Sequence, residues 1–84
     1  MEVYYTARFL RTFAKLEPNL QTDVELAIDD FVRDIHTPSL RLHKLHGNMK
    51  HYHAFSANYS YRVVVKIEKG NVHFMDVGDH SVYS

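Results

Sequence analysis

The chain has 84 residues, no cysteine and a formal net charge of zero, with ten Lys/Arg balanced by ten Asp/Glu. A chain of this length is expected to form one domain, residues 1–84, and its 45% hydrophobic and 24% charged content is that of a folded protein rather than a disordered one. The absence of cysteine excludes disulfides and thiolate chemistry and favours a cytoplasmic location. No apolar run reaches the ~20 residues of a membrane span, so we expect a soluble, unprocessed protein.

Charge is segregated along the chain. Residues 1–35 carry four Lys/Arg against seven Asp/Glu, whereas residues 36–84 carry six against three and all seven histidines. Partial protonation of the histidines near neutral pH makes the second part more cationic, because an unperturbed imidazole has a pKa of about 6.5. The zero total argues against a strongly nucleic-acid-binding surface over the whole molecule, but the basic part remains a candidate for one.

The first part of the chain predicts a short strand and two helices. Residues 1–5 are β-favouring, and Thr6 is a suitable N-cap for a helix that runs to about residue 16. Asn19 is the expected N-cap of a second helix, whose apolar stripe continues to about Ile35.

The second part predicts a three-stranded meander. Residues 39–48 alternate leucines with basic side chains and are expected to form an irregular segment. Residues 49–57, 59–67 and 72–77 have the patterns of strands, and Lys69-Gly70-Asn71 supplies the turn between the last two. The fold class is therefore α+β, in the order β-α-α-β-β-β, as an antiparallel sheet with two helices packed on one face.

Arg62 is the first candidate for chemistry. It lies on the polar side of a strand whose opposite parity is apolar, and a fixed guanidinium there offers planar donors for a phosphate or a carboxylate. An ordinary exposed arginine is the alternative interpretation.

Histidines and tyrosines provide further candidates. His51 and His53 share strand parity, about 7 Å apart by strand rise, and a histidine titrates in the range of a general acid or base. His80 follows a Gly-Asp pair near the chain end and is a candidate acid. Tyr52 and Tyr83 are candidates for stacking on a base. Surface histidines and core tyrosines remain the simpler interpretation of each.

A metal site is weakly supported. Five histidines are candidates to converge: His43, His46, His51, His53 and His80. No His-Glu-x-x-His arrangement is present, and neither is a Gly-rich phosphate loop, so we expect no metal and no cofactor.

Over essentially its whole length the chain resembles the RelE/ParE toxin superfamily, the toxins of type II toxin–antitoxin pairs, and within it the RelE/YafQ-like mRNA interferases. Three segments carry the resemblance: Leu45-His46-Gly47 before a strand, Tyr61-Arg62-Val63-Val64-Val65 within the next, and the terminal Val77-Gly78-Asp79-His80-Ser81-Val82-Tyr83.

The resemblance implies a ribosome-dependent endoribonuclease that inhibits translation. Arg62 matches the arginine that stabilises the phosphoryl-transfer transition state, His80 the general acid, and Tyr83 the terminal aromatic that positions the nucleotide. An ungapped alignment places His53 at the position of the base and Phe55 at the family's second basic position. The implied reaction needs no metal and leaves a 2′,3′-cyclic phosphate. The remaining expected substrate-binding residues are His46, Lys50, His51, Tyr52 and Lys66.

The resemblance also implies partners and leaves two alternatives. A cognate antitoxin, the ribosome and mRNA are the expected partners, and no membrane is. One alternative is a ParE-like inhibitor of DNA gyrase, which needs no acid–base pair. The other is a weakly active or inert protein of the same fold that mainly binds its antitoxin.

Overall fold

A computed structural model describes residues 1–49, 51–79 and 82 of the chain. The elements in order are β1 (Val3–Tyr5), α1 (Ala7–Ala14), α2 (Pro18–Arg33), the short 3-10 helix η1 (Pro38–Leu40), β2 (His43–Lys44), the 3-10 helix η2 (Gly47–Met49), β3 (Tyr52–Ser56), β4 (Arg62–Glu68) and β5 (Asn71–Gly78). The strands form one sheet in the order β1-β5-β4-β3-β2. None of the helices in the described ranges is long and apolar enough to cross a membrane.

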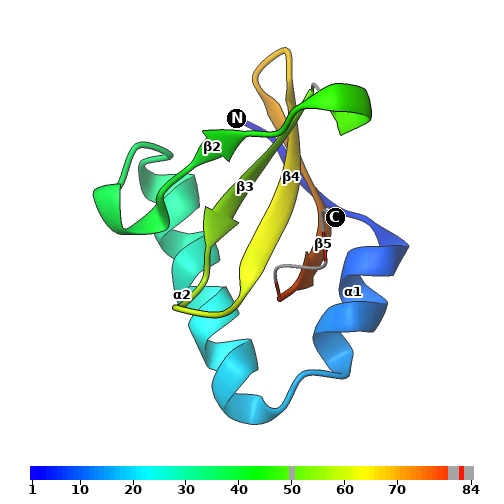
Figure 1. Cartoon of the computed structure of the whole chain (residues 1–84), viewed down its shortest axis with the longest axis vertical. Coiled ribbons are helices and arrows are strands. Elements are labelled where there is room, and N and C mark those ends of the chain that lie inside the picture. Colours follow the sequence, from blue (N-terminus) through cyan, green and yellow to red (C-terminus); the bar gives the residue numbers. More distant parts are fainter. Residues whose placement is uncertain (50, 80–81, 83–84) are drawn as a thin grey trace.

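The predicted α+β class is confirmed, but the sheet differs from the expected antiparallel one in two ways. β1 pairs with β5 in parallel, so the five-stranded sheet is mixed. The segment expected to be irregular contributes β2, which pairs with β3 at the other edge. The two helices carry the chain from one edge of the sheet to the other, and the strands then return one by one until β5 lies beside β1 (Figure 1).

The helices cover one face of the sheet, as predicted. α1 packs against β5, and α2 lies beside β3 (Figure 1). Phe31 of α2 stacks on Phe55 of β3 with ring centroids 4.7 Å apart, and Phe74 of β5 meets both rings edge-on. All three rings are fully buried. Each contributes about 1.5–3 kcal/mol through burial, so this aromatic cluster is a main source of stability.

Local signals explain where the helices begin. The Thr6 side chain accepts a hydrogen bond from the Phe9 N–H, which confirms it as the cap of α1. The expected cap of α2, Asn19, is wrong: the helix begins at Pro18, with Glu17 at the N-cap. Proline is favoured at the first helical position because its φ is already helical and its missing N–H is not needed there.

The opposite face of the sheet, which we call the helix-free face, carries a second, smaller cluster. Leu45, Ala54 and Val64 are buried there, and Tyr52, Met75 and Val82 pack against them. Short connections and the end of the chain therefore cover only part of this face.

Candidate functional site

Arg62 is the first residue of β4 and shares the parity of Val64, which belongs to the helix-free cluster, whereas Val63 lies in the main core. Its cross-strand partners are Ser56 on β3 and Gly78 on β5. Cross-strand partners share a face, so the start of β4 places a guanidinium among small residues on the helix-free face.

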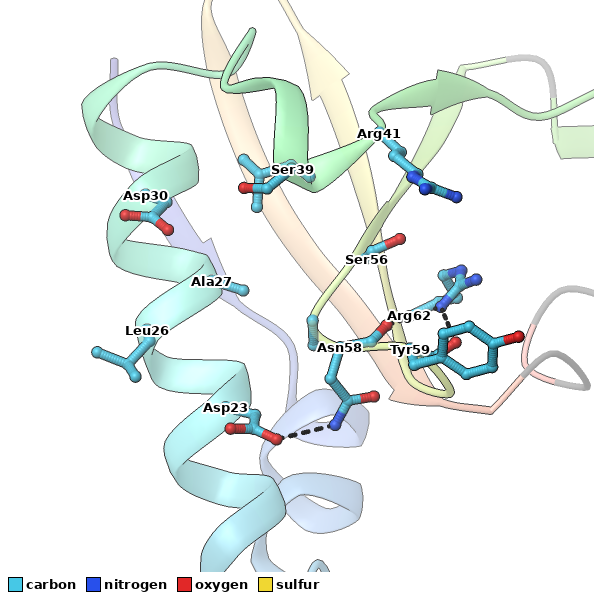
Figure 2. A pocket seen from close by; sticks show the side chains of 12 residues that line it. Asp23, Leu26, Ala27, Asp30, Ser39, Arg41, Ser56, Asn58, Tyr59 and Arg62 are labelled. Atoms are coloured by element: carbon cyan, nitrogen blue, oxygen red, sulfur yellow. Dashed lines mark hydrogen bonds between the residues drawn. The ribbon is translucent and has the colours of Figure 1, made fainter.

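The turn before β4, residues 58–61, is held by two side chains. The Asn58 Oδ1 accepts hydrogen bonds from the backbone N–H groups of Ser60 and Tyr61 at 2.9 and 2.8 Å. Its Nδ2 donates to the Asp23 carboxylate on α2 at 2.9 Å (Figure 2). These bonds explain why residues 59–61, expected to begin the strand, form a turn instead: an asparagine side chain competes with the sheet for backbone donors.

Arg62 completes this arrangement. Its Nη1 donates to the carbonyl oxygens of Asn58, Tyr59 and Tyr61 at 3.1, 3.3 and 3.1 Å. The guanidinium is thus fixed by the backbone of the turn. Among the bonds of the described residues only Nη1 donates, so Nε and Nη2 are the nitrogens suited to an anion.

A cleft of about 410 Å³ lies between α2, η1 and the 58–61 turn. Asp23 and Asp30 line it on the α2 side, and Arg41 and Arg62 line it on the other (Figure 2). The Asp30 carboxylate is paired with Arg33 of the same helix, so Asp23 is the carboxylate that faces the two arginines across the cleft.

The helix-free face continues from Arg62 along the strands. Lys66 lies four residues further along β4 and pairs with Tyr52 of β3. Between them, His43 of β2 pairs with Ala54 of β3 and so points to the same face. The His43 Nδ1 lies 3.1 Å from the Arg41 carbonyl oxygen. A carbonyl only accepts, so Nδ1 is the donor in this contact.

Val82, near the C-terminus, lies on this face. Val82 packs with the helix-free cluster, and its N–H donates to the Asp79 carbonyl at 3.0 Å. A Cβ added to Gly78 would lie 3.3 Å from the Val82 Cβ. Since Gly78 is the cross-strand partner of Arg62, Val82 is anchored beside the Arg62 strand position.

His53 does not share the face of Arg62, contrary to what a joint role on one phosphate requires. It has the parity of Phe55, which is buried against α2, and its cross-strand partners are Lys44 and Val65. Burial, followed by the nearby charges of Lys44 and His43, lowers the pKa of His53. Its Nδ1 is buried and has no hydrogen-bond partner among the described residues. This imidazole therefore lies on the helix side of the sheet, where its charged form is disfavoured.

The other predicted site residues divide into two groups. Tyr52 and Lys66 lie on the helix-free face with Arg62, while His46 and His51 are exposed in the connections on either side of η2. The remaining three, Lys50, His80 and Tyr83, lie outside the described residues. The described residues form no group of three or more His, Asp or Glu suited to a metal ion.

Comparison with solved structures shows a shared fold, although no protein-family model and no curated protein matches the sequence. YafQ from Escherichia coli strain BL21(DE3) superposes with a TM-score of 0.81 at 12% identity, over 95% of this chain and 93% of YafQ. A YoeB/ParE toxin from Agrobacterium tumefaciens gives 0.79 at 13% identity, over 95% and 99%. The toxin–antitoxin complex RelBE2 from Mycobacterium tuberculosis gives 0.75 at 21% identity, over 94% and 96%.

The chain has the fold of the RelE/ParE toxins. Within this RelE-like fold, Arg41 and Tyr59, which line the cleft with Arg62, were not predicted as site residues, and His43, on the same face two strands away, was named only as a metal candidate. Arg41 and His43 were read as part of an irregular segment, and Tyr59 as a buried strand residue. The Asn58 in front of Tyr59 is the signal that would have identified the turn.

Proposed function

We propose that this chain is the toxin of a type II toxin–antitoxin pair and that it cleaves mRNA on the ribosome. Two findings support the proposal: the likeness in fold to bacterial toxins over about 95% of the chain, and the guanidinium on the helix-free face. The observation that carries it is the position of Arg62. Backbone carbonyls orient this guanidinium in the cleft. A donor that stabilises negative charge in a transition state has to be oriented in advance in this way.

The proposed reaction is an attack by the ribose 2′-oxygen on the adjacent phosphorus. A base takes the 2′-hydroxyl proton, the bond from phosphorus to the 5′-oxygen breaks, and an acid protonates that oxygen. The products are a 2′,3′-cyclic phosphate and a 5′-hydroxyl. Arg62 would donate from Nε and Nη2 to the non-bridging oxygens, where negative charge increases in the transition state.

For the base we assign His43 in place of His53. His43 lies on the face of Arg62, two strands across the sheet and one row along, and its Nδ1 is within hydrogen-bond distance of the Arg41 carbonyl. His53 is on the helix side. The resemblance assigns the acid to His80 and nucleotide positioning to Tyr83, and both assignments remain part of the proposal.

The test is expression of the isolated chain in bacterial cells, with primer-extension mapping of mRNA 5′ ends. We expect growth arrest and cuts in phase with codons. Arg62→Ala and His80→Ala should abolish both. His43→Gln and His53→Gln form a matched pair: the first should remove cleavage, and the second should retain it. Cuts that persist in His43→Gln but vanish in His53→Gln would return the base role to His53.

A second candidate is a binding protein of the same fold that cleaves nothing, either an inhibitor of DNA gyrase or a protein that mainly binds its antitoxin. The observation that favours it is the use of Arg62 Nη1 on three backbone carbonyls, a structural role that requires no substrate. Growth arrest without new mRNA ends would support an inhibitor. The absence of both growth arrest and new mRNA ends would support a protein that mainly binds its antitoxin.

A cognate antitoxin is the proposed protein partner in either case. The chain that superposes on this protein in the RelBE2 structure is part of a toxin–antitoxin complex. The basic half of this chain suits an acidic partner segment. Copurification of the chain with the product of an adjacent reading frame would test this.

A further inference from the structure

Tyr59 is the most exposed large hydrophobic side chain of the described residues, at 96% relative accessibility. Exposed tyrosines are ordinarily found on mobile loops, but this one lies on a braced turn. The Asn58 side chain bonds two N–H groups of the turn, and the Arg62 guanidinium bonds three of its carbonyls. The aromatic ring is thus presented to solvent by a rigid turn, without contributing to the core.

Arg41, on the same side of the cleft as Arg62, is held in a strained backbone conformation. Its φ and ψ are 52° and 45°, the left-handed region, at the end of η1. A non-glycine residue there costs free energy, and such residues occur preferentially where a side chain has a function. Glycine would relieve the strain and remove the guanidinium.

The cleft combines these groups with a wall of opposite charge. Arg41, Tyr59 and Arg62 lie together on one side, and Asp23 lies across from them on α2 (Figure 2). Carboxylates repel phosphate, so an anionic ligand would place its charge at the two arginines. The cleft volume of about 410 Å³ is within the range of small-molecule sites.

We infer that Arg41, Tyr59 and Arg62 form a nucleotide subsite, in which the two guanidiniums hold a backbone phosphate and the Tyr59 ring stacks on the attached base of single-stranded RNA. The inference rests on the proposed ribonuclease function, in which Arg62 meets the scissile phosphate, and identifies where the nucleotide attached to that phosphate is held. A phosphate between two arginines and a base on an aromatic face are the two contacts that single-stranded RNA makes with proteins of little sequence preference. An acidic peptide would form ion pairs with the arginines, but its carboxylates would not stack on the exposed Tyr59 ring.

The experiment measures binding of a fluorescein-labelled 2′-O-methyl RNA hexanucleotide, which cannot be cleaved by 2′-oxygen attack, through fluorescence anisotropy. Tyr59→Ala should weaken binding about tenfold, and Tyr59→Phe, which keeps the stacking face, should stay within about twofold. Leu10→Ala is the control, because Leu10 is also an exposed hydrophobic residue, at 53%, but lies on α1, away from the cleft. It should bind as the parent does.

Arg41→Gly provides an independent test. It should weaken RNA binding about tenfold and lower the slope of log affinity against log salt by about 0.7, the value for one phosphate contact of a single strand. Its melting temperature should stay the same or rise, because the strain at Arg41 is relieved. A structural defect would instead lower both affinity and melting temperature.

Several results would overturn the inference. They are parent-like RNA affinity in both Tyr59→Ala and Arg41→Gly, equal losses in Leu10→Ala and Tyr59→Ala, no RNA binding by the parent chain, or displacement of the RNA by oligoglutamate but not by unlabelled RNA. Failure of the proposed function has a different result: the variants bind RNA as expected, but the parent chain produces no mRNA cuts. Codon-phased cleavage that is unchanged in both variants would refute the subsite alone.

Discussion

Replacing Asn58 with alanine tests whether the 58–61 turn organises the candidate site. The substitution removes three hydrogen bonds, to the N–H groups of Ser60 and Tyr61 and to the Asp23 carboxylate. The bond to Ser60 is exposed and contributes about 0.5 kcal/mol, the partly buried bond to Tyr61 about 1 kcal/mol, and the partly buried bond to a charged group about 1.5 kcal/mol. We therefore expect Asn58→Ala to lose about 2–3 kcal/mol of unfolding free energy.

The assay is urea denaturation followed by circular dichroism, together with thermal melting. Each kcal/mol corresponds to a shift of ~4–8 °C in a domain of this size, so the melting temperature should fall by roughly 10–20 °C. Asn19→Ala is the control, because Asn19 is exposed in the first turn of α2, where alanine is a better helix former. It should be neutral or slightly stabilising.

A double-mutant cycle with Asp23→Ala isolates the contact between the turn and α2. If the Asn58–Asp23 bond has the expected strength, the two losses should be non-additive by about 1 kcal/mol or more. A loss of less than about 0.5 kcal/mol in Asn58→Ala, or strictly additive effects in the cycle, would refute the view that this side chain holds the turn.

Three further predictions concern the core, the chain end and the buried histidine. Phe31→Ala should cost about 3–5 kcal/mol of unfolding free energy because it leaves a cavity beside Phe55, whereas Leu26→Ala, 59% exposed on the same helix, should cost little in the same denaturation assay. Gly78→Ala should displace the Val82 side chain, seen as changed methyl chemical shifts, with a stability loss below about 1 kcal/mol; unchanged Val82 shifts would contradict the contact. The pKa of His53 is lowered in the folded protein, so unfolding takes up protons as the pH falls through about 6.5, and stability should fall over that range. His53→Gln should flatten this dependence, and an equally steep profile in the variant would assign it to other groups.

The sequence was most informative where structure depends on neighbouring residues. The cap at Thr6, the apolar stripe of α2 and the alternation along β4 are local patterns, and each corresponds to the structure. The parallel pairing of β1 with β5 was not predictable in this way, because it depends on contacts between residues about seventy positions apart. Neither was β2: residues 39–48 do alternate leucines with basic side chains, but only two of them, His43 and Lys44, form a strand, and that pairing depends on β3.

The candidate site was harder to predict because a strand residue belongs to a face only relative to its neighbours. His53 was assigned by its position in the sequence. Phe55 is buried against Phe31 of α2, and His53, two residues earlier on the same strand, therefore also points toward the helices. The same register brings His43 to the face of Arg62 through its pairing with Ala54. The histidine that shares the face of Arg62 is therefore a different one from the one expected, in a segment that was not predicted to form a strand.

The zero net charge of the chain is compatible with RNA binding once the charges are placed on the structure. Asp23 and Asp30 on α2 form one wall of the cleft, and Arg41 and Arg62 the other, so the charges cancel in the total but not locally. Screening reduces the influence of exposed charges beyond about 8 Å at physiological ionic strength, so a phosphate responds mainly to the groups nearest to it. An RNA strand would be attracted to the arginine side and repelled from α2, which restricts it to one path across the helix-free face. If the chain binds RNA as proposed, the acidic residues of α2 would form a boundary for the strand, and the binding would be local without the protein being basic overall.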